Sequence, residues 1–257
     1  MKIAVLISAA QTFPKYQLTN AISLATALDT SITGIITSEQ GLDYYPMGEG
    51  GMIDVVQERI ESAEKCITGC VEEFRSLCET HGIAQEWYAK HGFIRHEWPA
   101  LSPYFDLAVA TAPFSAPELA NTGISATMQI ASATKIGGFD RRCVIAWDGS
   151  MAAGRAVRAA LPLLPRFKEV EVITIDAKSR SLPTDIGSYL AAHDIEASIT
   201  SEVSGDATVP ELIMEQARHA DLLVMGAYGS SMMIEKIFGG VTETVLSECT
   251  TPVLFAH

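Results

Sequence analysis

The segment ADLLVMGAYG spans residues 220–229, and the segment GGVT follows at residues 239–242 after a spacer of nine residues. The run 222–225 is apolar without alternation, which is typical of a strand in a parallel sheet that helices cover on both faces. Such strands point their carboxyl ends at ligands. Gly226 and Gly229 fall where this strand must turn, and we expect them to permit positive φ and a close approach of a ligand to the backbone. The segment therefore predicts a phosphate-cradling loop at the end of a buried strand.

The residues after this loop predict a helix and a last strand. Apolar residues between 241 and 249 have the spacing of an amphipathic helix, whose start could face a phosphate. Residues 252–256 are short and apolar, as expected of a final strand. Glycines at strand ends are also ordinary turn punctuation, so the first pair alone would mean little. The whole order of strand, glycine pair, fixed spacer, glycine pair, helix and terminal strand makes the signal specific.

The composition is that of a globular, acidic protein. Of the 257 residues 48% are hydrophobic, and the apolar runs are too short to span a bilayer. The formal net charge of -13 opposes binding to nucleic acid or to an anionic membrane, because the net field repels polyphosphate. Five cysteines form no disulfide framework in a chain of this length, and residues 1–8 read as a strand rather than a signal peptide. We therefore expect a cytoplasmic protein.

The chain repeats one order of elements. The two most similar segments are YFDLAVA at residues 104–110 and HADLLVM at residues 219–225. The predicted strands and helices are 3–8, 16–28, 31–37, 53–81 and 84–89 in the first half, and 143–147, 154–164, 170–175, 186–193 and 197–203 in the second. Strands that alternate with helices predict parallel βαβ units. The fold class is therefore α/β, with two tandem doubly wound domains over residues 1–139 and 140–257.

The glycine motif resembles that of the universal stress protein family, whose nucleotide-binding members carry Gly-x2-Gly-x9-Gly-(Ser/Thr) at this place. Gly226, Gly229 and Gly239 match it, while Gly240 stands where the family has Ser or Thr. This difference removes a hydroxyl donor but keeps the backbone amide. Over essentially the whole chain the resemblance is to a tandem universal stress protein. It implies Rossmann-like five-stranded parallel sheets in the order 3-2-1-4-5.

The resemblance also implies partners and pairing. The family domain works elsewhere as a dimer, so the two halves could pair within the chain, or the last strand at 252–256 could pair with a second chain in a homodimer. The fifth strand of the first domain is the weakest element of the repeat. Residues 131–139 are its candidate, although glycine and polar residues interrupt them.

The resemblance implies that the second domain binds an adenine nucleotide, ATP or AMP, with or without Mg²⁺. An acidic residue at the position of Asp148 contacts the nucleoside in nucleotide-binding members, and an N-cap for the following helix is its alternative role. The residues implied to line the base and to surround the ribose and phosphates are Ala146, Ile175, Met225, Gly226, Gly229, Gly239, Gly240, Val241 and Thr242. Without the resemblance, Ile175 and Met225 would be ordinary core residues and Thr242 a second N-cap candidate.

The first domain has no such loop. In the register set by Asp106 and Asp221, the three motif glycines are replaced by Thr111, Phe114 and Ile124. A β-branched or bulky side chain is strained where a turn needs positive φ, and it would occupy the phosphate volume. We therefore expect at most one nucleotide site per chain.

The resemblance implies a sensor or regulator of stress responses. The alternatives are a nucleotide-free scaffold of the same fold that acts through protein–protein interaction, and a slow nucleotide hydrolase. Lys236 is the only Lys or Arg after Gly226, and no acidic pair indicates a magnesium site. We therefore predict no catalytic residues and at most weak ATP hydrolysis. Residues 91–98 are a further cluster, predicted to be a loop packed by Trp98 and Phe93, with a ligand site as the alternative.

Overall fold

The structure is a computed structural model that describes residues 1–9, 15–38, 53–111, 126–130, 138–176, 184–227 and 240–256. The described elements of the first half are β1 (Ile3–Ser8), α1 (Lys15–Leu28), β2 (Ile32–Ser38), α2 (Ile53–Thr80), β3 (Gln85–His91), α3 (Ile94–Leu101), η1 (Ser102–Tyr104), β4 (Leu107–Thr111) and β5 (Thr127–Ile130). Those of the second half are β6 (Arg142–Ala146), α5 (Met151–Ala160), η2 (Leu164–Arg166), β7 (Glu169–Ile175), α6 (Ile186–Ala191), β8 (Ser198–Glu202), α7 (Val209–Ala217), β9 (Leu222–Gly226), α9 (Val241–Glu248) and β10 (Val253–Ala256).

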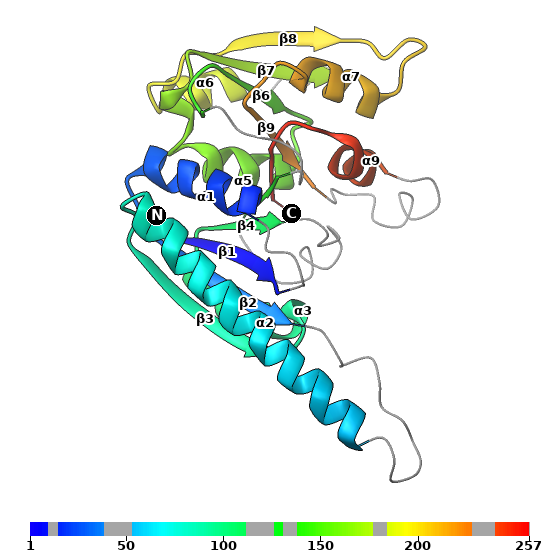
Figure 1. Cartoon of the computed structure of the whole chain (residues 1–257). Helices are drawn as coiled ribbons and strands as arrows, with labels where there is room; N and C mark the ends of the chain where they lie inside the picture. Colours follow the sequence, from blue (N-terminus) through cyan, green and yellow to red (C-terminus); the bar gives the residue numbers. More distant parts are fainter. Residues whose placement is uncertain are drawn as a thin grey trace.

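All ten strands form one sheet, in the order β3-β2-β1-β4-β5-β10-β9-β6-β7-β8 (Figure 1). Within each half the strands are parallel, and the order along the chain is 3-2-1-4-5 in both. The predicted α/β fold class and strand order are thus confirmed. The two halves meet through β5 and β10, which pair antiparallel with Met128 opposite Leu254.

The two halves also share their register. Asp106 and Asp221 set the predicted register, and in each half the residue after this aspartate pairs with the first strand. Leu107 pairs with Ile3, and Leu222 pairs with Cys143. The alignment of the two halves that the sequence predicts therefore agrees with the strand pairing. Each paired residue of β1 and β4 has a defined counterpart in β6 and β9.

Two predicted elements lie elsewhere. The fifth strand of the first half is Thr127–Ile130, so the prediction of residues 131–139 is wrong. Residues 131–137 lie outside the described residues, and Phe139 follows in a bend. Helix α5 begins at Met151, three residues before the predicted start, because Ser150 caps it.

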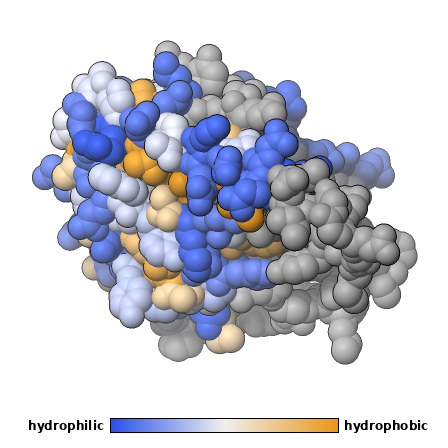
Figure 2. All heavy atoms as spheres, turned by 60° about the horizontal axis from the view of Figure 1, so that its bottom comes forward, coloured by the Kyte–Doolittle hydropathy of each residue, from blue (hydrophilic) through white to orange (hydrophobic). Residues whose placement is uncertain are grey.

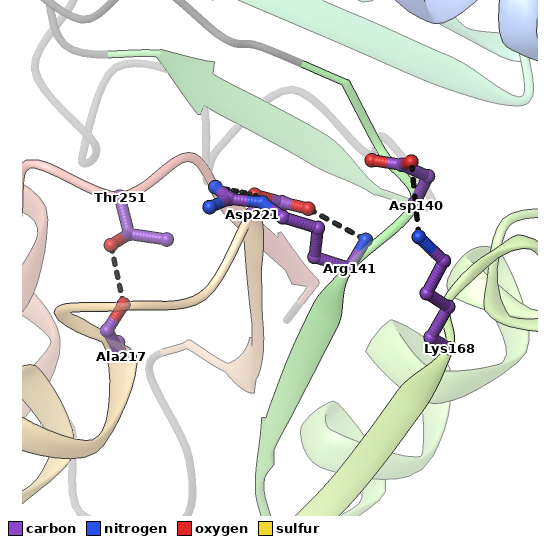
Figure 3. A network of polar contacts seen from close by, with 6 residues as sticks. All are labelled: Asp140, Arg141, Lys168, Ala217, Asp221 and Thr251. Carbon is purple, nitrogen blue, oxygen red and sulfur yellow. Dashed lines mark hydrogen bonds and ion pairs between the residues drawn. The ribbon is translucent and has the colours of Figure 1, made fainter.

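The aspartates that precede β4 and β9 tie these strands to the start of each half. The Lys2 backbone amide donates to the Asp106 carboxylate at 2.6 Å, and the Arg141 backbone amide donates to Asp221 at 2.8 Å. The Arg141 guanidinium donates to the second oxygen of Asp221, as Figure 3 shows. Asp221 is buried, so these bonds offset the cost of removing its charge from water.

The core differs between the two faces of the sheet. On one face a single cluster of buried residues runs through both halves, and it packs α1, α2, α5 and α6 against the strands. On the other face the core is divided, with one cluster under α3 and another under α7 and α9. The halves therefore share a core on one side of the sheet and keep separate ones on the other.

The surface agrees with the acidic composition. Hydrophilic residues cover much of the described part of the face in Figure 2, with hydrophobic residues scattered among them. In the described parts of the chain, no helix combines the length and hydropathy needed to cross a bilayer.

The seam between β5 and β10 predicts a large effect of a buried charge. Leu254 is 0% exposed and lies between β5 and β9, so Leu254→Asp would place an unpaired carboxylate in the core. We expect the free energy of unfolding to fall by about 4 kcal/mol or more. Urea denaturation followed by circular dichroism measures this.

The matched control is Ile199→Asp on the edge strand β8, where the side chain is 53% exposed. We expect a loss below about 1 kcal/mol there. Equal losses in the two variants would contradict the role given to the seam.

Candidate functional site

The candidate site lies where β6 and β9 end. These two strands are neighbours in the sheet, although β7 and β8 separate them in the chain. Strand β6 therefore has β7, the next strand in the chain, as its neighbour on one side and β9 as its neighbour on the other. Ligands of open parallel sheets bind at such a switch point, outside the carboxyl ends of the strands.

Four predicted residues from separate segments come together here. Met225 of β9 lies opposite Ala146 of β6. Ile175 at the end of β7 and Val241 at the start of α9 pack against the same hydrophobic cluster. Met225 is buried, while the other three are partly buried. We call these four residues of one cluster the apolar floor of the candidate site.

Gly226 ends β9 directly against helix α5. A Cβ built at this position would lie 2.5 Å from the backbone nitrogen of Ala153 and 3.0 Å from the carbonyl carbon of Ala152. Backbone atoms in a capped helix cannot easily move away, so only glycine fits. Gly226 does not have positive φ, and the prediction of a φ requirement there is wrong. The close approach that the glycine permits is that of α5.

The turn from β6 to α5 contains the glycine with positive φ. Gly149 has φ +76°, and it is flanked by Asp148 and Ser150. The Ser150 hydroxyl is the N-cap and accepts from the Ala153 amide at 3.0 Å. The Asp148 carboxylate accepts from the Ser150 amide at 2.8 Å. Asp148 is therefore not the N-cap; it holds the turn with one oxygen while its side chain remains exposed.

The Asp-Gly-Ser sequence carried a signal for this turn. Asp accepts from a backbone amide two residues ahead, and Gly adopts positive φ without strain. The cap at Ser150 and the positive φ at Gly149 are therefore two features of the site that the predictions for Asp148 do not include.

The start of α9 forms another edge of the site. Gly240 is the N-cap, with φ −62° and ψ 160°, and it has no side chain that could cap the helix. The Thr244 amide donates to the Gly240 carbonyl at 3.1 Å. Thr242 is buried in the first turn, and Val241 is partly buried. The hydroxyl missing at Gly240 is thus at the position where Ser or Thr would cap the helix. Gly229 and Gly239 lie outside the described residues.

The first half has different side chains at the equivalent place. The residues at the positions of Ala146, Asp148, Ile175 and Met225 are Leu6, Ser8, Thr37 and Ala110. Leu6 is larger than its counterpart, whereas the other three residues are smaller than theirs. Trp98 of α3 lies on the same face of the sheet as Leu6. Leu6 and Trp98 are both 0% exposed and belong to the same cluster. Thr111 ends β4, and Phe114 and Ile124 lie outside the described residues.

The cluster at residues 91–98 is a helix in its second part, since α3 begins at Ile94. Trp98 is in the core and stacks on Phe105 with 5.7 Å between ring centroids, as the packing interpretation predicted. Glu97 accepts from the Lys90 amine at 2.7 Å and from the Tyr88 hydroxyl at 2.9 Å. These bonds tie α3 to β3. Within the described residues, no group of three or more His, Cys, Asp or Glu side chains could hold a metal ion.

Comparisons with known proteins agree with this architecture. Residues 187–257, from α6 to β10, match the universal stress protein family. Comparison with curated proteins finds no match. A universal stress protein from Archaeoglobus fulgidus DSM 4304 superimposes with a TM-score of 0.70 and 17% identity, covering 98% of this chain and 97% of that chain. A functionally unknown protein from Pseudomonas aeruginosa PAO1 has a TM-score of 0.58 and 11% identity, covering 98% and 91%.

These likenesses establish the fold over nearly the whole chain. The family match covers the segment that contains the glycine motif, so the resemblance to a tandem universal stress protein is confirmed by the family match there and by the fold elsewhere.

The contact between Gly226 and α5 predicts a strong effect of one methyl group. Gly226→Ala would force Ala152 and Ala153 away from β9, and we expect a loss of about 3 kcal/mol in the free energy of unfolding. Gly69→Ala in the exposed interior of α2 is the control, because a Cβ there meets nothing within 4 Å. We expect this control to gain about 0.5–1 kcal/mol. Urea denaturation measures the free energy of unfolding of both variants. A Gly226→Ala protein as stable as the wild type would contradict the close contact between Gly226 and α5.

The ion pair at α3 predicts a pH dependence. The hydrogen bond from Lys90 holds the pKa of Glu97 below its usual value of 4.5, and that from Tyr88 acts in the same direction. The stabilisation is therefore complete above pH 4.5 and is lost as the pH falls through the lowered pKa. We expect Glu97→Gln to lower the melting temperature at pH 7, and the difference from the wild type to shrink in acid.

Calorimetric melting between pH 3 and 7 measures this difference. Glu79→Gln removes an exposed partner of Arg75 on α2 and is the control, with little expected effect at any pH. A Glu97→Gln difference that is constant with pH would argue against the charge as its cause.

Proposed function

We propose that this chain, whose residues 187–257 match the universal stress protein family, is a cytoplasmic stress-response protein that binds ATP or AMP in its second half. The observation that carries the proposal is that four apolar residues from separate segments belong to one cluster, with Ala146 and Met225 paired at the carboxyl ends of β6 and β9 and Asp148 two residues after β6. The glycine motif follows β9 directly. Binding would couple nucleotide level to a regulatory output.

Each part of the site has chemistry suited to one part of the nucleotide. The floor formed by Ala146, Ile175, Met225 and Val241 suits the flat faces of an adenine base, because pockets for such rings are mainly apolar. The exposed Asp148 carboxylate can accept hydrogen bonds from ribose hydroxyls. The N-cap Gly240 has no side chain to cap the first amides of α9, and amides at a helix start suit a phosphate.

The charge of the chain affects how phosphates would be held. With a net charge of -13, the overall field does not attract a polyanion. Binding would therefore depend on local amides at helix starts and in the glycine loop rather than on lysine or arginine. Magnesium, where needed, would arrive bound to the phosphates, and we propose a sensor rather than an efficient hydrolase.

One observation favours the alternative of a nucleotide-free scaffold that acts through protein–protein interaction. Gly226 is required by its contact with α5, so this glycine would be kept even without a ligand. The missing hydroxyl at Gly240 points the same way. Direct binding measurements separate the two functions.

The proposal predicts a specific loss on removal of one charge. Asp148→Asn keeps an oxygen that can accept from the Ser150 amide, so the turn should persist, but a ribose would lose a charged acceptor. We expect ATP and AMP to bind roughly tenfold more weakly by isothermal titration calorimetry. Asp185→Asn is the control, because Asp185 likewise accepts from a backbone amide, at the N-cap of α6.

Binding of ATP and AMP to the wild-type protein is the first measurement, because it separates the nucleotide function from the scaffold function. If it binds neither ATP nor AMP at millimolar concentration, the nucleotide function is wrong and the scaffold function stands. Equal affinities for wild type and Asp148→Asn would remove Asp148 from the site.

A further inference from the structure

Gln129 connects the first half of the chain to a helix of the second. It lies on β5, opposite Val253 of β10. Its side-chain nitrogen donates to the Leu246 carbonyl of α9 at 2.6 Å, across 117 residues of sequence. Its side-chain oxygen is buried and has no hydrogen-bond partner among the described residues. The amide is therefore only half satisfied, and the described bond of its nitrogen is to α9.

The symmetry of the seam makes this glutamine unusual. Because Met128 lies opposite Leu254 at the centre, the counterpart of Gln129 in the second half is Phe255. Phe255 is 2% exposed and belongs to the hydrophobic core. An apolar side chain thus fits this position of the fold. A partly buried amide whose buried oxygen has no partner among the described residues weakens folding relative to such a residue, so packing does not explain Gln129.

The bond has a clear structural effect on α9. The last four carbonyls of a helix have no partner within it, and Leu246 is among them. The Cys249 amide takes the Val245 carbonyl, and Gln129 takes that of Leu246. With eight residues α9 is about 12 Å long, so a bond near one end restrains the direction of the whole axis.

The other end of α9 belongs to the candidate site. Gly240 and Val241 begin the helix there, and Gly240 has no side chain that could cap it. The direction of the first amides consequently depends on what holds the helix elsewhere. Gln129 is a polar contact to α9 from the first half.

We infer that Gln129 is a positioning residue for the nucleotide site. It fixes α9 from the first half, so that the amides at the start of the helix face the carboxyl ends of β6 and β9. The inference rests on the proposed function and adds to it: the half that lacks the glycine motif supplies a contact that positions a part of the site in the other half.

The test compares nucleotide affinity with stability. Gln129→Met keeps the length of the side chain, removes the donor to Leu246 and also removes the unpaired oxygen. We expect roughly tenfold weaker binding of ATP or AMP by calorimetry, with a melting temperature within about 3 °C of the wild type. A purely structural role would lower the melting temperature and leave the affinity of the folded protein unchanged.

Thr127→Val is the matched control. Thr127 lies on the same strand and the same face, is 3% exposed, and the change leaves the Leu246 contact intact. We expect wild-type affinity in this variant. Equal weakening in both variants would assign the effect to the seam in general and overturn the role of Gln129.

Hydrogen exchange in the nucleotide-free protein gives an independent readout. Amides in the segment 240–250 should exchange several-fold faster in Gln129→Met than in the wild type, while those of α5 should not change. If the wild type binds no nucleotide but α9 loosens in this way, the proposed function fails and the restraint of α9 by Gln129 stands. If the wild type binds and Gln129→Met binds equally well, the inference fails and the function stands.

Discussion

The antiparallel pairing of β5 with β10 is the contact on which the rest of the architecture depends. Each half ends in a four-residue strand that would otherwise be a bare sheet edge, open to pairing with another chain. Pairing the two closes both edges and produces one ten-stranded sheet. It also lets one hydrophobic cluster continue through both halves and brings Gln129 beside α9. The last strand, which was a candidate for pairing with a second chain, thus pairs with β5 of the same chain.

The sequence contained most of this fold. Apolar runs without alternation marked the central strands, and the repeated aspartates set a register that the pairing of β4 with β1 and of β9 with β6 reproduces. Strand β5 was missed for a physical reason. It has only four residues, and two of them, Thr127 and Gln129, are polar, so it lacks the continuous apolar run of the other central strands. A partner more than 100 residues away leaves no local signal.

The candidate site, like strand β5, was only partly predictable from the sequence. Residue types and spacing predicted its place at the carboxyl edge and the residues of its apolar floor, which meet in one cluster. The reason for Gly226 could not be read from the sequence. A glycine after a strand can serve a ligand, a turn or a neighbouring helix, and only the 2.5 Å approach to Ala153 identifies the helix. The positive φ belongs to Gly149, in the turn that Asp148 and Ser150 hold.

Duplication explains why the halves can differ. A lone domain must keep its own binding loop, whereas a fused pair can divide the parts of one site. In the first half Leu6 stands where the second has Ala146, and the burial of Leu6 and Trp98 in one cluster strengthens the core of that half. That half remains necessary because its fifth strand completes the sheet. Once the seam is fixed, Gln129 can hold α9 although its amide weakens folding, so the half without the glycine motif acts on the site beside it.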